Sequence, residues 1–135
     1  MRRHPYLRAY MAGLLIPSWV LLVVLAAYVA GHFANHLPAG LERLIIFPMA
    51  VVPNLWGIWN TIYVALGLHR HLSIGAYGAL LPLLLMPAGL GLTALLHLRF
   101  YTVADAALLL PAVIAAYYLL WNYGVSAVNR IVDLP

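Results

Sequence analysis

The stretch PNLWGIWN, residues 53–60, places one proline, two asparagines and two tryptophans inside a segment that is otherwise apolar enough to cross a membrane. Pro53 removes a backbone donor and crowds the carbonyl of Met49, so we expect a bend and a freed carbonyl that Asn54 can satisfy locally. Small residues on one helical face of this region allow another helix to come close. That face consists of Pro53, Gly57, Asn60, Val64 and Gly67.

The chain around this stretch is strongly apolar. Of its 135 residues, 66% are hydrophobic and 7% are charged, whereas roughly a quarter are charged in a soluble domain. This composition predicts an all-α integral membrane protein with a single domain over residues 1–135. The chain has no cysteine, which excludes disulfides, thiolate metal sites and thiol catalysis. Its basic excess is typical of membrane topology, so we expect no nucleic-acid partner.

Four segments are long enough to cross a bilayer core of about 30 Å, which takes roughly 20 residues of helix. They span residues 10–32, 44–68, 74–96 and 106–128. We expect them to form a compact four-helix bundle, with the first segment retained and not cleaved as a signal peptide. Five of the seven arginines fall on one side of these spans: Arg2, Arg3, Arg8, Arg70 and Arg130. The positive-inside rule therefore predicts that both termini are cytoplasmic, in a multipass protein of the bacterial inner membrane.

The chain also resembles itself at a nearly constant offset. A shift of 65 residues aligns the first predicted helix with the third, and a shift of 62 aligns Trp59-Asn60 with Trp121-Asn122. The pairs matched at the first shift include His4 with His69, Gly13 with Gly78, Pro17 with Pro82 and His32 with His97. The alternative is chance matching in a composition dominated by leucine and alanine. A true duplication predicts two parallel helical hairpins, residues 4–68 and 69–130, related by an axis along the membrane normal.

A polar series follows the fourth predicted span in steps of four, four, three and four residues, which is typical of one helical face. Its members are Tyr118, Asn122, Ser126, Asn129 and Asp133. Amides that faced lipid would lack partners, so the series should face protein or water. Two roles are open: hydrogen bonds that pack helices together, or a path or pocket for a small neutral solute or a cation. The second role assigns the lining to Asn54, Asn60, Asn122, Ser126 and Asn129.

Histidines at the outer ends of the first and third spans suggest a cofactor site as an alternative. His32 follows Tyr28 by four residues and His97 follows Thr93 by four, so each pair shares one helix face. Two imidazoles at matched depth could ligate a haem iron from both sides or hydrogen-bond a quinone. Otherwise both are interfacial histidines that face water or lipid headgroups.

Residues for catalysis are scarce. No Asp or Glu lies within the spans, so neither a single-carboxylate antiporter nor a paired-carboxylate hydrolase has its titrating groups. We therefore expect no enzyme and no metal site. In the turn between the second and third spans, His69 and His71 flank Arg70, and we expect contact with lipid phosphate there.

The run WNTIYVALG, from Trp59 to Gly67, resembles the W-x-x-L-Y-x-x-x-G run of the tryptophan-rich sensory (translocator) proteins. The resemblance covers nine residues and implies a site for porphyrins or other hydrophobic ligands. Those proteins have five helices.

From the residues themselves we expect a small channel- or transporter-like membrane protein. The alternatives are a haem- or quinone-binding anchor that uses His32 and His97, and a non-catalytic membrane assembly subunit. The expected partners are the lipid bilayer and either further copies of the chain or another membrane subunit.

Overall fold

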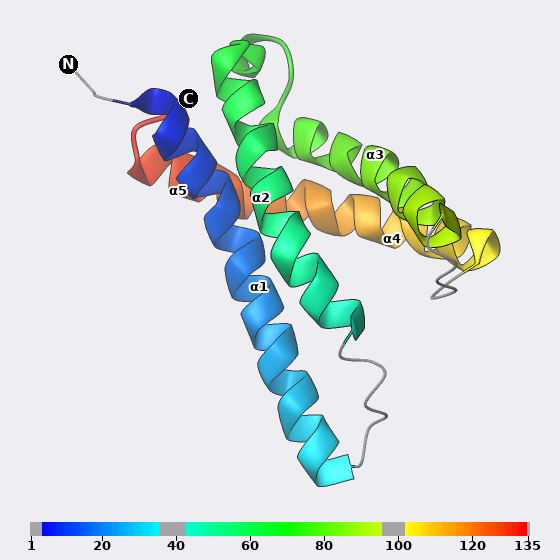
Figure 1. Ribbon diagram of the computed structural model, residues 1–135. Helices are drawn as coiled ribbons and strands as arrows, with labels where there is room; N and C mark the ends of the chain where they lie inside the picture. Colours follow the sequence, from blue (N-terminus) through cyan, green and yellow to red (C-terminus); the bar gives the residue numbers. More distant parts are fainter. Residues whose placement is uncertain (1–3, 36–42, 96–101, 135) are drawn as a thin grey trace. The chain divides into compact units, whose positions relative to one another are not determined.

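The computed structural model describes residues 4–35, 43–95 and 102–134, and every regular element among them is helical (Figure 1). The expected all-α class is therefore confirmed. The elements are α1 (Pro5–Asn35), α2 (Arg43–Ala65), the 3₁₀ turn η2 (Leu68–Arg70), α3 (Ile74–Leu95), α4 (Val103–Leu119), the π-helical segment η3 (Leu120–Val125) and α5 (Ser126–Ile131).

Three of the described helical stretches are long and apolar enough to cross a membrane: Pro5–Ala34, Ile74–Gly91 and Val103–Ile131. The remaining predicted span corresponds to α2, whose 23 residues extend roughly 34 Å at about 1.5 Å per residue. In length alone, α2 therefore also matches a bilayer core of about 30 Å. The orientation of the termini stays a prediction, and Arg2 and Arg3 lie outside the described residues.

The chain divides into two compact units. The first contains residues 1–66 and 128–135, and the second contains residues 67–127. In the first unit α1 and α2 lie side by side, and in the second α3 packs against α4 and η3 (Figure 1). Each unit is thus built on one helical hairpin, and the first also includes the end of the chain.

Two glycines permit the close approach of α1 and α2. A Cβ at Gly13 would lie 2.5 Å from the carbonyl oxygen of Trp56 and 2.8 Å from Cβ of Asn60. A Cβ at Gly57 would lie 2.7 Å from the ring of Tyr10. These separations are well inside the 3.5–4.0 Å at which carbon atoms pack favourably. The small-residue face predicted around the stretch 53–60 is therefore a packing face.

Glycines set the helix spacing of the second unit in the same way. A Cβ at Gly78 would overlap the side chain of Trp121, and one at Gly75 would lie 2.9 Å from Cβ of Asn122. Trp121 is 0% exposed and meets the ring of Tyr77 edge-on, with the ring centroids 6.0 Å apart. Edge-to-face contacts of this kind are a preferred aromatic geometry. The core of the second hairpin is therefore formed by the side chain of Trp121 packed on Gly78.

We expect Gly78→Ala to lower the free energy of unfolding by about 1–3 kcal/mol, because its methyl group must displace the buried Trp121. Unfolding of the detergent-solubilised protein, followed by circular dichroism, measures this change. Gly91→Ala is the matched control on the same helix, since a Cβ at Gly91 meets no described residue within 4 Å. Equal stability of the two variants would contradict the packing described here.

Candidate functional site

Two buried asparagines of the first unit bond to each other. The Nδ2 of Asn60 donates to Oδ1 of Asn129 at 2.8 Å and to the carbonyl oxygen of Ala9 at 2.8 Å. The Nδ2 of Asn129 donates back to Oδ1 of Asn60 at 3.1 Å. Asn60 is 0% and Asn129 is 1% exposed. We call Asn60, Asn129 and the Ala9 carbonyl the amide cluster; its two side chains satisfy each other inside the apolar first unit.

The local packing of α1 explains how Asn60 reaches a backbone carbonyl. Ala9 and Ala12 are buried, and Gly13 brings no side chain against Cβ of Asn60. A carbonyl oxygen has two lone pairs, so that of Ala9 can accept from Asn60 while it serves the helix ladder of α1. Gly13 therefore makes the third partner of the amide cluster accessible.

Asn129 follows the π-helical segment η3 in the chain, and the sequence does not indicate this π turn. Trp121, Val125 and Asn129 are 0%, 0% and 1% exposed and follow one another in steps of four. In a regular α-helix two such steps would drift by about 80°, because four residues exceed one turn of 3.6. The wider turn of η3 offsets the part of this drift that falls between Trp121 and Val125, which are both buried in the second unit.

The residues of the polar series predicted along the fourth span differ in how deeply they are buried. Tyr118 is exposed, Asn122 and Ser126 are half-buried, and Asn129 is the fully buried member of the series. Asn122 belongs to the second unit, where it lies beside Gly75. The side chain that bonds Asn60 is Asn129, whereas the internal alignment had matched Asn60 with Asn122.

The end of the chain is fastened to the first unit beyond the amide cluster. The backbone N–H of Leu134 donates to the carbonyl of Asn129 at 2.8 Å, and Leu134 is buried. The Arg8 guanidinium lies 3.8 Å from the Asp133 carboxylate. Ion pairs as exposed as this one contribute little, with a median of about 0–1 kcal/mol. The burial of Asn129 and Leu134 is therefore the main anchor of the C-terminal residues.

Asn54, the other predicted lining residue of α2, occupies an exposed position. Its Nδ2 donates to the carbonyl of Ala50 at 2.9 Å, and its Oδ1 accepts from the hydroxyl of Tyr10. Asn54 therefore does satisfy a carbonyl near Pro53, although it is that of Ala50 and not that of Met49. The hydrogen bond from Tyr10 also links α1 to α2.

Sequence reasoning missed two of these partners. Ala9 contributes only a backbone carbonyl, which no side-chain pattern signals, and it lies 51 residues before Asn60. Tyr10 lies 44 residues before Asn54. One signal was available: the matched Gly13 and Gly78 each lie where a Cβ would collide with the other helix of the hairpin.

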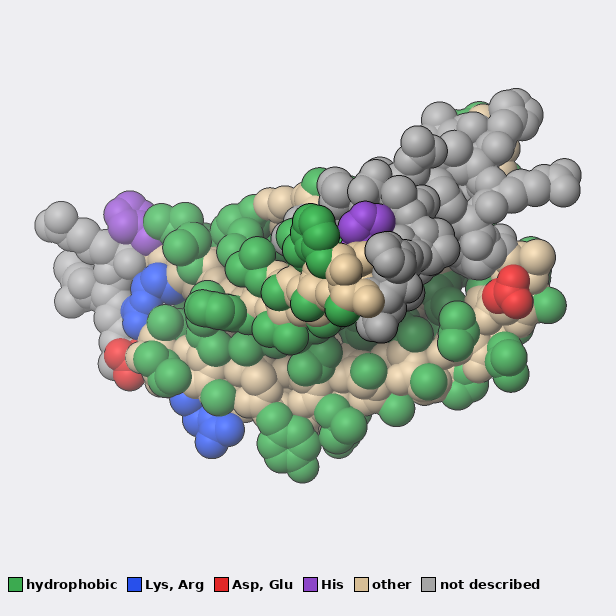
Figure 2. All heavy atoms as spheres, turned by 90° about the horizontal axis from the view of Figure 1, so that it is seen from below, with side chains coloured by type: hydrophobic (Ala, Val, Ile, Leu, Met, Phe, Trp, Pro, Cys, Tyr) green, Lys and Arg blue, Asp and Glu red, His purple; other side chains and the backbone are tan. Residues whose placement is uncertain are grey.

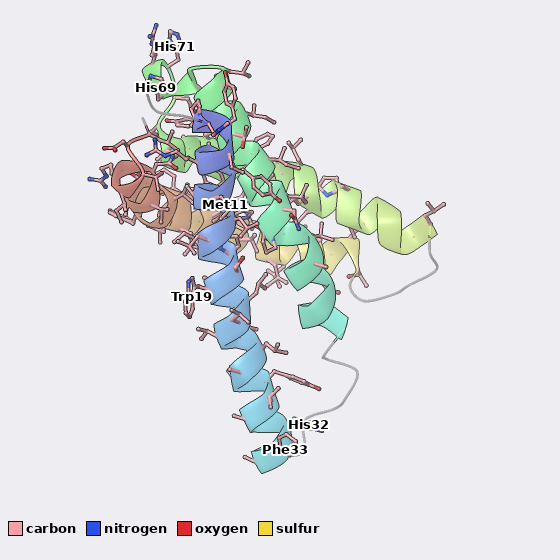
Figure 3. The ribbon with its side chains drawn as sticks, turned by 60° about the vertical axis from the view of Figure 1, so that its left-hand side comes forward. Met11, Trp19, His32, Phe33, His69 and His71 are labelled. Atoms are coloured by element: carbon pink, nitrogen blue, oxygen red, sulfur yellow. The ribbon has the colours of Figure 1, made fainter. Side chains whose placement is uncertain are left out.

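Of the two histidines proposed as haem or quinone ligands, the structure describes His32 and not His97. His32 is half-buried and its ring stacks on Tyr28, with centroids 5.9 Å apart and planes 30° apart; it also meets Phe33 edge-on. Figure 3 places His32 and Phe33 at the far end of α1 from Met11. The side chain of Thr93 and the whole of His97 lie outside the described residues. Within the described parts of the chain, no three His, Asp or Glu side chains gather as a metal site would need.

No family model, curated protein or solved structure matches the chain. The nine-residue resemblance to the tryptophan-rich sensory proteins therefore comes without a family match. Within that run, Asn60 and Tyr63 are buried and Trp59 is half-buried. The chemistry of the amide cluster and of the neighbouring polar residues is therefore the basis for a function.

A double-mutant cycle measures the bond between Asn60 and Asn129. We expect Asn60→Ala and Asn129→Ala each to lower the free energy of unfolding by about 1–3 kcal/mol, because each leaves a buried amide without its partner. The double variant should lose less than the sum, by about 0.5–1.5 kcal/mol, since neither amide is then stranded. Asn54→Ala serves as an exposed control with a smaller loss. Strict additivity at Asn60 and Asn129 would contradict the pairing.

Proposed function

We propose that the chain is a non-catalytic multipass membrane protein whose role is assembly within the bilayer, with both termini in the cytoplasm of a bacterial cell. The amide cluster is the observation that supports this proposal most directly. Asn60 and Asn129, two of the five residues predicted to line a path, have their amides engaged with protein in a closed core. Hydrogen bonds of this kind commonly pack membrane helices and average about 0.6 kcal/mol. A conducting path would instead need amides available to the solute.

The outer surfaces of the hairpins suit lipid or a membrane partner. Met11 and Trp19 of α1 are 59% and 63% exposed (Figure 3). Figure 2 shows a face on which hydrophobic side chains predominate and charged ones are few. Apolar surface on this scale is stable in acyl chains or against another apolar subunit, and not in water. The proposed partners are accordingly the bilayer and either further copies of the chain or another membrane subunit.

We also propose that the two hairpins arose by duplication, with one uniform shift of 65 residues. At this shift Gly13 matches Gly78 and Trp56 matches Trp121, and in each hairpin that glycine packs on that tryptophan, through its carbonyl or its side chain. Both tryptophans are at most 1% exposed. The same shift matches Tyr10 with Gly75 and Gly57 with Asn122. In the first hairpin the larger side chain, Tyr10, lies on α1 against Gly57; in the second, the larger one, Asn122, lies on η3 against Gly75. This agreement favours the uniform shift over the shift of 62 for the second and fourth helices.

A channel- or transporter-like role is the second candidate, and one observation favours it. Asn122 and Ser126 are half-buried and lie within or next to the π-helical segment. Single π turns occur frequently at functional sites. Uncharged amide and hydroxyl groups suit a small neutral solute or a partly dehydrated cation. In this candidate the second hairpin supplies the polar lining and the amide cluster stays closed.

A flux assay separates the two roles. The protein is reconstituted in liposomes, and the flux of potassium ions and of glycerol is compared with protein-free vesicles. The assembly role predicts no excess flux, from either the parent protein or Asn122→Leu, and a defined oligomer on cross-linking in the same vesicles. Excess flux that Asn122→Leu reduces, with Asn54→Leu as the polar-to-apolar control, would overturn the assembly role in favour of the channel.

A further inference from the structure

The turn between α2 and α3 presents three basic side chains in a row. His69, Arg70 and His71 are all exposed, and His69 and His71 extend outward from the turn (Figure 3). The turn begins at Gly67, whose φ of 62° lies in the left-handed region that glycine adopts without strain. These three residues, here called the basic tip, belong to the second unit.

The backbone of the basic tip is held by its own hydrogen bonds. The N–H of Arg70 donates to the carbonyl of Gly67 at 3.2 Å, and the N–H groups of His71 and Leu72 both donate to the carbonyl of Leu68 at 2.9 Å. Leu68 and Leu72 are half-buried while the residues between them are exposed. The turn therefore holds the backbone from which the three exposed basic side chains project.

The start of α3 adds to the positive potential of the tip. Ser73 caps the helix, since its Oγ accepts from the N–H of Ala76 at 3.2 Å. The first N–H groups of a helix have no partner within it, and its N-terminal end carries a partial positive charge. The tip thus combines a guanidinium, two imidazoles and a helix N-terminus.

No carboxylate of the second unit neutralises this end. In residues 67–127 the one acidic residue is Asp105, at the start of α4. The N–H and the hydroxyl of Thr102 donate to the Asp105 carboxylate at 2.9 and 2.7 Å, in a capping box. The tip precedes α3 and Asp105 follows it, so the 22 residues of α3, about 33 Å, separate them.

We propose that the basic tip binds the phosphate of an anionic phospholipid headgroup. The tip lies at the junction of two predicted spans, which places it at headgroup depth. Arg70 can pair with phosphate through two N–H groups, and each imidazole can donate a further ring N–H. Membranes attract basic residues that flank a span, by about 1 kcal/mol for each lysine or arginine. The inference rests on the membrane location in the proposed function but not on the assembly role.

Native mass spectrometry of the detergent-solubilised protein tests the proposal. The protein is titrated with phosphatidylglycerol or with phosphatidylcholine, and apparent affinities are taken from the bound fractions. We expect tighter binding of phosphatidylglycerol, a roughly fivefold loss of that affinity in Arg70→Ala, and a further loss in His69→Ala/His71→Ala. Arg70→Lys, which keeps the charge but loses the paired N–H groups, should lose less affinity than Arg70→Ala. Arg130→Ala, which removes the same charge from α5, should leave it unchanged.

Three results would overturn the proposal: no preference for phosphatidylglycerol over phosphatidylcholine, equal losses in Arg70→Ala and Arg130→Ala, or full displacement of the lipid by an equal concentration of inorganic phosphate. The last result would assign the site to a free anion. Circular dichroism of each variant shows that it is folded. Flotation with phosphatidylcholine vesicles tests the membrane location separately, because a chain that fails to float contradicts that location whatever its lipid preference.

Discussion

A side-chain amide placed in an almost uncharged apolar chain must find a hydrogen-bond partner, and the first unit of this protein depends on that constraint. Leaving a buried amide unsatisfied costs about 1–3 kcal/mol. Asn60 and Asn129 meet this requirement with each other and with the Ala9 carbonyl. Gly13 has no side chain in the way of Asn60, and Asn129 is fully buried in the same unit. The same bonds hold the last helical residues of the chain against the first hairpin.

The two hairpins share a packing plan and differ in their polarity. In each hairpin a glycine packs on a buried tryptophan: Gly13 on the carbonyl of Trp56, and Gly78 on the side chain of Trp121. Under the proposed shift of 65 residues, Asn60 corresponds to Val125, and both are 0% exposed. The first hairpin thus places an amide where the second places a β-branched apolar side chain. Within the described structure the buried amide pair therefore belongs to the first unit alone, which is consistent with a role in fastening the end of the chain.

Much of this architecture could be predicted from the sequence, because span length and small-residue spacing are local properties. The face containing Gly57 and Asn60 is buried as its helical periodicity indicates. The partner of Asn60 could not be predicted, because the internal alignment matches Asn60 with Asn122, whereas Asn60 bonds to Asn129. No residue type between Leu120 and Val125 signals a π turn in advance. Contacts such as Tyr10 with Asn54 also escape sequence reasoning, because they join residues far apart in the chain.

The first unit depends centrally on two amides that face each other in a closed core, and nuclear magnetic resonance can observe this pairing directly. In protein labelled with ¹⁵N and reconstituted in nanodiscs, the side-chain amide protons of Asn60 and Asn129 should show nuclear Overhauser effects to each other. They should show no exchange with water. Effects from either amide to water, together with none between the two residues, would contradict the amide cluster and would instead support a hydrated path.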